Sequence, residues 1–263
     1  MTDSAALKID RASNYISQLS ELFKKSPPFE VVVKTNVISR DRYLRAKANV
    51  AVIDEAALIC GDVIHNLRTA IDHAYWDIIS PHVTEKNERR KIQFPFGEKR
   101  SGFKRAMKTR YAALGGFDFV CGLVSLRPYL EDGGNKLLHL IHELDAVDKH
   151  QLLLPTVSVT KVTVDLIRKH CADFPARMQG PGVIGLHGPN AGFRWHANIL
   201  TREELGEIIP PTLTIFERKL DIPVDVIFDV SKGQYSGEVI PLLNEMTNVT
   251  REVVAIIRRP AGR

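Results

Sequence analysis

The sequence lacks a long apolar run. Nowhere in its 263 residues does an apolar stretch approach the roughly 20 residues that a membrane-spanning helix needs. The chain opens, after Asp3, with a polar amphipathic run that differs from a secretory signal peptide. We therefore expect a cytoplasmic protein with no membrane partner.

Cysteine is also scarce, and several catalytic motifs are missing. The three cysteines lie far apart without C-x-x-C spacing, so we expect neither a disulfide framework nor a cysteine zinc site. The patterns G-x-x-x-x-G-K-[ST], G-x-S-x-G and H-E-x-x-H do not occur. The glycine-rich run at 180–188 lacks the lysine and the following helix of a phosphate loop, so we expect no bound cofactor.

What is present is an ordinary globular composition. The chain is 44% hydrophobic and 25% charged, and it is long enough to bury a sizeable core. Its net charge of +5 is compatible with an anionic partner such as RNA or a nucleotide. The excess is too mild to establish nucleic-acid binding.

The order of the predicted elements indicates an α+β fold, because no βαβ repetition is visible. We expect residues 1–263 to form a single integrated domain with a strand-rich segment at 151–230. Apolar residues at helical spacing predict a helical core of four long helices at 4–24, 54–79, 135–150 and 236–257.

A mainly antiparallel sheet is predicted from residues 29–50 and 156–230, which are rich in β-branched residues. Two short helices are also expected, at 103–110 and 117–126. The individual strands are predicted at 29–39, 42–50, 156–167, 183–186, 192–200 and 224–230.

The helical stretch Gly61–Ile79 has an unusual polar face. One side carries an apolar stripe that includes Ile64, Leu67 and Ile71. A solvated face opposite such a stripe is usually rich in Lys and Glu, and this one has neither. Its residues are instead Asp62, His65, Asn66, Arg68, Thr69, Asp72, His73 and Trp76.

The predicted helix 135–150 carries a second group of histidines. His139, His142, Glu143 and His150 lie on its side opposite the leucines. Two histidine-bearing helices suggest a polar, functional face between them. The densest positive run lies elsewhere, and it indicates either a solvated helix face or a phosphate contact: Lys99, Arg100, Lys104, Arg105, Lys108 and Arg110.

A metal site is one hypothesis for these faces. His139 and Glu143 are four residues apart, and an imidazole and a carboxylate at this spacing can share a transition metal. Asp62, His65, Asn66 and His73 could supply further ligands across a helical bundle. Neither helix carries the Glu-x-x-His pair of di-metal carboxylate bundles, so this helical-bundle metal-binding protein remains an alternative.

The segment Arg68-Thr-Ala-Ile-Asp-His73 is an Arg-x4-His motif on the central helix. Here the chain resembles the HEPN superfamily, whose helical-bundle members include metal-independent ribonucleases with an Arg-x4–6-His motif near a dimer interface. The resemblance implies that His73 handles protons around the attacking 2′-hydroxyl or the leaving oxygen, and that Arg68 stabilises charge on the phosphate. The two side chains are about 140° apart on one helix, a spacing that a composite site in a homodimer accommodates.

A longer pattern covers residues 61–150: Gly61-Asp-x-x-His-Asn-Leu-Arg-x-Ala-x-Asp-His-x-x-Trp76, then Phe94-Pro95, then Asp148-Lys-His150. It resembles a group of uncharacterised bacterial proteins, and this resemblance implies no activity. Our leading hypothesis is an HEPN-like RNA-binding protein or metal-independent endoribonuclease that acts as a homodimer. Its candidate catalytic residues are Arg68, Asp72 and His73, and its candidate binding residues are His65, Asn66, His139, His142, Glu143, Lys149 and His150.

A non-enzymatic interaction protein is the alternative from a different class. In that case the polar residues of the two helices interlock as a buried network, which sets the register of the helices and needs every member satisfied. The distance between the two polar faces would discriminate the hypotheses. An open cleft would favour chemistry, and a dry core would favour the structural role.

Overall fold

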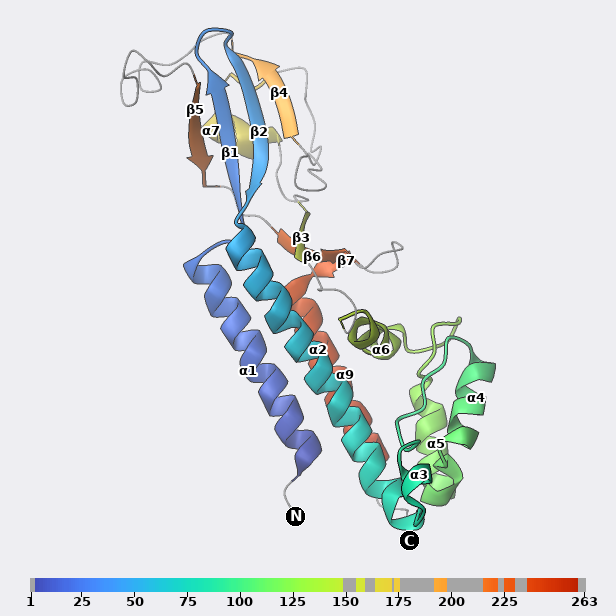
Figure 1. Cartoon of the computed structure of the whole chain (residues 1–263). Helices are drawn as coiled ribbons and strands as arrows, with labels where there is room; N and C mark the ends of the chain where they lie inside the picture. Colours follow the sequence, from blue (N-terminus) through green and yellow to red (C-terminus); the bar gives the residue numbers. More distant parts are fainter. Residues whose placement is uncertain are drawn as a thin grey trace. The chain divides into compact units, whose positions relative to one another are not determined.

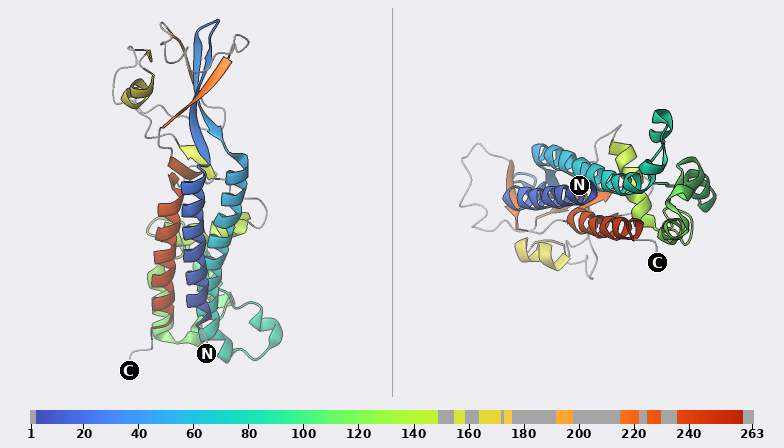
Figure 2. Two further views of the ribbon diagram at one scale, coloured as in Figure 1. Left: turned by 90° about the vertical axis from the view of Figure 1, so that its left-hand side faces the viewer. Right: turned by 90° about the horizontal axis from the view of Figure 1, so that it is seen from below.

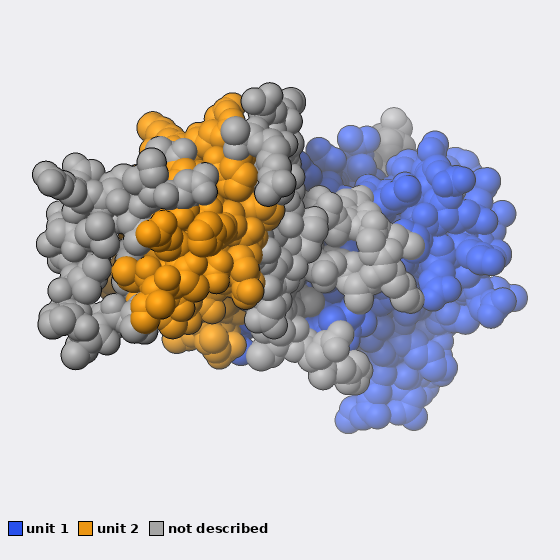
Figure 3. All heavy atoms as spheres, turned by 90° about the horizontal axis from the view of Figure 1, so that it is seen from above, with its two compact units in different colours: residues 1–21, 56–153, 240–263 blue, residues 22–55, 154–239 orange. Residues whose placement is uncertain are grey.

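The computed structural model describes residues 3–148, 155–158, 164–171, 173–175, 192–197, 215–221, 225–229 and 236–259. Helices and antiparallel strands together confirm the α+β fold class. The chain divides into two compact units, coloured separately in Figure 3. Unit 1 comprises Met1–Glu21, Ala56–Leu153 and Ile240–Arg263, and unit 2 comprises Leu22–Glu55 and Leu154–Val239. The single integrated domain stays a prediction, and each unit is described by itself.

Three long helices form the frame of unit 1. They are α1 (Ser4–Lys25), α2 (Val50–Ile79) and α9 (Val239–Ile257), and within the unit they lie side by side (Figures 1 and 2). The apolar residues of α1 recur at helical spacing and are buried, which explains why this stretch forms an amphipathic helix. Arg258, just after α9, pairs with Asp3 at 2.6 Å and with Asp77 of α2 at 3.1 Å.

Shorter helices complete unit 1. Their bounds are α3 (Lys86–Arg89), α4 (Arg100–Thr109), α5 (Phe117–Leu126) and α6 (Lys136–Asp148), with 3₁₀ turns at Ser80–His82 and Ala112–Gly115. Helix α6 begins after Asn135, whose side-chain oxygen accepts the Leu138 N–H at 3.0 Å, as an N-cap does. Tyr75, Phe94, Phe103 and Leu123 are fully or almost fully buried in the core that these helices share with α1, α2 and α9.

Unit 2 contains a four-stranded antiparallel sheet in the order β4-β2-β1-β5. One face of the sheet packs against α7 (Val164–His170) through a core that includes Val33, Leu44, Ile167 and Trp195. The strands are β1 (Phe29–Asn36), β2 (Asp41–Ala48), β4 (Gly192–His196) and β5 (Ile215–Leu220). A second antiparallel sheet joins β3 (Pro155–Ser158), β6 (Asp225–Asp229) and β7 (Ser236–Glu238).

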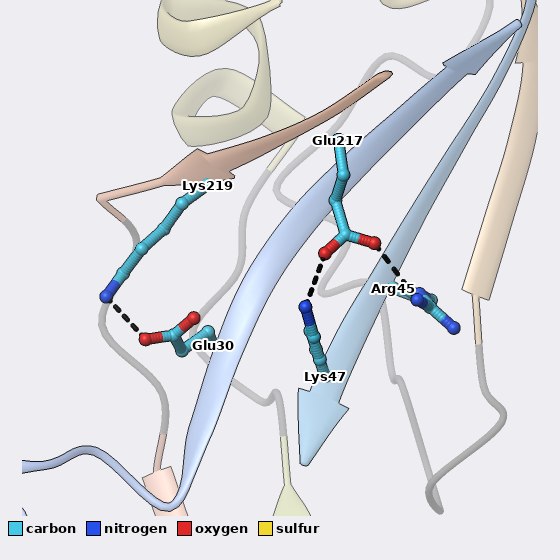
Figure 4. A network of polar contacts seen from close by, with 5 residues as sticks. All are labelled: Glu30, Arg45, Lys47, Glu217 and Lys219. Atoms are coloured by element: carbon cyan, nitrogen blue, oxygen red, sulfur yellow. Dashed lines mark hydrogen bonds and ion pairs between the residues drawn. The ribbon is translucent and has the colours of Figure 1, made fainter. Parts of the chain in front are cut away.

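The other face of the four-stranded sheet carries cross-strand ion pairs, which we call the outer-face pairs (Figure 4). Glu217 of β5 pairs with Lys47 at 2.7 Å and with Arg45 at 3.0 Å, both on β2. Lys219 of β5 pairs with Glu30 of β1 at 2.6 Å. Side chains alternate between the two faces along a strand, so Arg45 and Lys47 of β2 lie on the face that the buried Leu44 does not occupy.

Several predicted boundaries need correction. The last four residues of the predicted strand 156–167 belong to α7, in which Val164, Ile167 and Cys171 are buried at helical rather than alternating spacing. Helix α2 begins at Val50 instead of 54. The residues expected to begin the last helix at 236 form β7, which pairs with β6.

Three further points concern the strands. The charged strand β5 was not predicted, because its sequence Ile-Phe-Glu-Arg-Lys-Leu carries a weak apolar signal. The described strands form two sheets instead of one. The predicted strand 183–186 lies outside the described residues.

None of the described helices combines the length and the apolar character that crossing a membrane requires.

Candidate functional site

The polar faces of α2 and α6 meet in unit 1 through His65 and Asp145. The His65 Nδ1 lies 3.1 Å from the Asp145 Oδ1, with a buried carboxylate and an exposed imidazole. The hydroxyl of Thr69 lies 3.5 Å from the His65 Nε2. A buried carboxylate thus orients an imidazole that reaches solvent, which is an arrangement suited to holding or moving a proton.

Arg68 points into the interior and is only 6% exposed. Its Nη1 lies 2.6 Å from the Asp72 Oδ1, one helical turn further along α2. The guanidinium carbon lies 4.6 Å from the centre of the Phe96 ring, within the range of a cation–π contact. The positive charge is therefore neutralised and covered within the fold.

Asp72 links α2 to the corner around Phe94. Its Oδ1 accepts the Phe94 N–H at 2.8 Å, and the Phe94 carbonyl in turn accepts a hydrogen bond from the Arg110 guanidinium. Tyr75 donates its hydroxyl to the Arg110 carbonyl at 2.8 Å. Burial, and then the charge of Arg68, lowers the pKa of Arg110, and burial raises the pKa of Tyr75.

His142 of α6 stacks on Phe96, with ring centres 4.6 Å apart and an angle of 11° between the rings. Burial, and then the charges of Arg68, His139 and Arg110, lowers the pKa of His142 from 6.5 to about 4. The imidazole is therefore neutral near neutral pH. Its Nδ1 has no hydrogen-bond partner within the described part of the chain.

His139 lies next to this group and is also buried. Its Nδ1 is 3.7 Å from the Glu143 Oε1, and its ring meets the His142 ring edge to face at 6.2 Å. We give the name polar seam to the set Arg68, Asp72, Arg110, His139 and His142. Arg68 and His139 are buried, and the other three are partly buried. Among the described residues, no three His, Cys, Asp or Glu side chains form a group that could hold a metal ion.

Asn66 and His73 lie outside the polar seam. Asn66 donates to the Asp62 carbonyl at 2.7 Å, and its side-chain oxygen accepts from Lys8 of α1 at 3.2 Å. His73 is partly buried, and its Nδ1 has no hydrogen-bond partner in the described ranges. In those ranges no hydrogen bond, ion pair or ring contact joins His73 to Arg68, so the predicted pair is not brought together within one chain.

A glycine explains how closely the end of α6 approaches α2. A Cβ on Gly61 would collide with the carboxylate of Asp148. Burial, and then the negative charges of Asp145 and Asp62, raises the pKa of Asp148. Gly61 and Asp148 both belong to the sequence pattern noted over residues 61–150, and this close contact gives both positions a physical reason.

The structure thus brings some of the predicted site residues into contact and adds others that were not predicted. Lys149 and His150 lie outside the described residues. Phe96, Arg110 and Asp145 were missed, although Asp145 lies one helical turn after His142 and was therefore visible as a neighbour on α6. Arg110 was expected to belong to the basic run near α4, and only the fold shows that its guanidinium turns inward to Phe94.

Comparison with family models, with curated proteins and with solved structures finds no match to the chain.

Proposed function

We propose that the chain is a non-enzymatic interaction protein in which the polar seam holds the helices of unit 1 in register. The observation that carries this proposal is the burial of Arg68 with its charge neutralised by Asp72 at 2.6 Å. A phosphate-binding arginine must present free N–H groups to its ligand. Arg68 instead directs its guanidinium toward Asp72 and the Phe96 ring.

The contacts around Asp72 support the same role. One carboxylate serves both an arginine of its own helix and the backbone of the Phe94 corner. That corner then binds Arg110 through the Phe94 carbonyl. A chain of contacts of this kind specifies one packing arrangement, because each buried group depends on the next.

Incubation of the purified protein with labelled RNA in EDTA tests the proposal. We expect the wild type to leave the RNA intact, because Arg68 is not accessible to a phosphate. Cleavage that is lost in His73→Ala, and retained in the control His82→Ala, would overturn it if both variants melt like the wild type. His82 is a suitable control because it is an exposed histidine outside the polar seam.

RNA binding, with or without cleavage by an HEPN-like homodimer, is the second candidate. It is favoured by the cations on and just before α4, since Lys99, Arg100, Lys104, Arg105 and Lys108 are all exposed. Such a surface would bind RNA with an affinity that falls steeply as salt rises. Binding titrations across salt concentrations, with sedimentation to measure the oligomeric state, test this candidate.

A further inference from the structure

Unit 1 contains a cavity of about 610 Å³ that lies apart from the polar seam. It is lined by α4, α5 and the segment that follows α5. A cavity of this volume suits a small organic ligand, since such sites usually measure roughly 300–1,000 Å³. Its apolar lining consists of Phe103, Met107, Val120, Val124 and Tyr129.

The charged residues that line the cavity are mostly positive. Arg100, Lys104 and Arg127 line it together with one carboxylate, Asp132. Arg100 and Lys104 are exposed, and no ion pair to either side chain occurs within the described part of the chain. Glu131, outside the lining, accepts the backbone N–H of Arg100 at 3.0 Å. The lining thus combines an apolar wall with cations that are available to an anion.

Arg127 provides an independent observation, because its backbone is left-handed. With φ 48° and ψ 54° it ends α5 at a position where glycine is the usual residue. Residues other than glycine are disfavoured in this conformation, so the turn itself does not require an arginine at this position. Its guanidinium donates to the Gly133 carbonyl at 3.3 Å, and both residues line the cavity. Strained residues of this kind gather at ligand-binding sites.

We propose that this cavity binds a small anion with an apolar body, whose head group is a carboxylate or a phosphate. The apolar body would contact residues such as Met107 and Val124, and the head group would pair with Arg127, Lys104 and Arg100. A guanidinium suits both head groups because its donors match two oxygens at once. None of the residues of the polar seam lines the cavity, so this inference does not depend on the function proposed above.

Calorimetry with decanoate, decyl phosphate and decanol, each below its micelle concentration, tests the ligand class. We expect one molecule of decanoate or decyl phosphate to bind per chain, and decanol to bind about tenfold more weakly, since it lacks the charge-assisted contacts. Binding of decanoate alone identifies a carboxylate ligand, and binding of decyl phosphate alone identifies a phosphate ligand. Equal binding of decanol, or no binding of any of the three, would overturn the proposal.

Arg127→Gly is the most informative variant, because stability and binding should change in opposite directions. Glycine relieves the left-handed backbone and raises the melting temperature, while loss of the guanidinium weakens anion binding about tenfold. A lower melting temperature together with unchanged affinity would show a structural arginine and would contradict the proposal. Lys104→Gln, which leaves the turn intact, should also weaken binding.

The exposed cations Arg105 and Lys108 of α4 provide matched controls. They do not line the cavity, so Arg105→Gln and Lys108→Gln should leave the affinity for the anion unchanged. A ten-nucleotide single-stranded RNA completes the test. If this RNA binds, decanoate and decyl phosphate do not, and all four cation variants weaken RNA binding alike, then the surface is an RNA contact and the cavity proposal fails.

Discussion

The polar seam of unit 1 and the outer-face pairs of unit 2 contain ion pairs of the same length in different surroundings. Arg68 and Asp72 approach to 2.6 Å, with side-chain exposures of 7% and 28%. Lys219 and Glu30 also approach to 2.6 Å, with exposures of 58% and 34%. Distance therefore does not distinguish the two pairs, and burial does.

Burial changes what each pair contributes to stability. Water solvates the exposed partners whether or not they meet, so such pairs contribute little and weaken in salt. A buried charge has no such alternative, and removing its partner leaves it desolvated and unpaired. The polar seam should therefore be sensitive to single substitutions, whereas the outer-face pairs should tolerate them.

The largest expected effect is that of Asp72→Ala. The substitution leaves Arg68 buried without its counter-ion and removes the acceptor of the Phe94 N–H. Breaking a buried pair in this way costs about 3–5 kcal/mol of the free energy of unfolding. Urea denaturation followed by circular dichroism measures the change.

Asp77→Ala is the matched control on the same helix. Asp77 is an exposed carboxylate that pairs with Arg258 at 3.1 Å, so its loss should cost less than about 1 kcal/mol. The double variant Arg68→Met/Asp72→Ala should recover part of the loss, because it removes the stranded charge as well. Equal costs for Asp72→Ala and Asp77→Ala would show that burial does not separate the two classes of ion pair.

The pH dependence of stability should show the lowered pKa of His142. Its pKa is about 4 in the folded protein and 6.5 for an ordinary histidine, so the unfolded chain binds the proton first as pH falls. The free energy of unfolding therefore decreases as pH falls from 6.5 to about 4. The decrease is at most about 3 kcal/mol, and about 2 kcal/mol once the partial exposure of His142 is taken into account.

His142→Phe keeps a ring against Phe96 and removes the titration, so its stability should fall less between about pH 7 and about pH 4. Chemical denaturation at several pH values measures both profiles. The raised pKa of Asp148 acts in the opposite direction in both proteins and cancels in their difference. Parallel profiles for the two proteins would mean that His142 keeps an ordinary pKa in the fold.

The long helices could be predicted because their signals are local. The predicted helix 4–24 corresponds to Ser4–Lys25, since one apolar stripe fixes its period and two prolines follow it. The predicted strand 156–167 is confirmed at its start, in β3, and wrong at residues 164–167, because a few apolar residues do not distinguish a strand from a short helix. Val164 and Ile167 are buried in the core that α7 shares with the sheet, and such tertiary contacts cannot be read from a local sequence pattern.

The candidate site likewise has one part that local sequence predicts and another that depends on tertiary contacts. Periodicity alone placed Arg68 and Asp72 on one face of α2, and they pair there. Periodicity could not show that this face turns inward against Phe96, which comes from a separate corner of the chain. Whether a polar face is solvated or buried depends on such partners, and for Arg68 this decides between a ligand contact and a structural contact.

The smallest expected effect is that of Glu217→Gln in the outer-face pairs. The substitution removes the ion pairs to Lys47 and Arg45, yet the cost should be only about 0.5 kcal/mol in low salt, because exposed pairs are weak. In about 1 M NaCl, where screening acts within roughly 3 Å, the difference from wild type should vanish. The cost of Asp72→Ala should persist in the same buffer, because salt does not reach a buried charge. Denaturation of both variants at two salt concentrations makes this comparison, and a salt-resistant cost for Glu217→Gln would place its ion pairs with those of the polar seam.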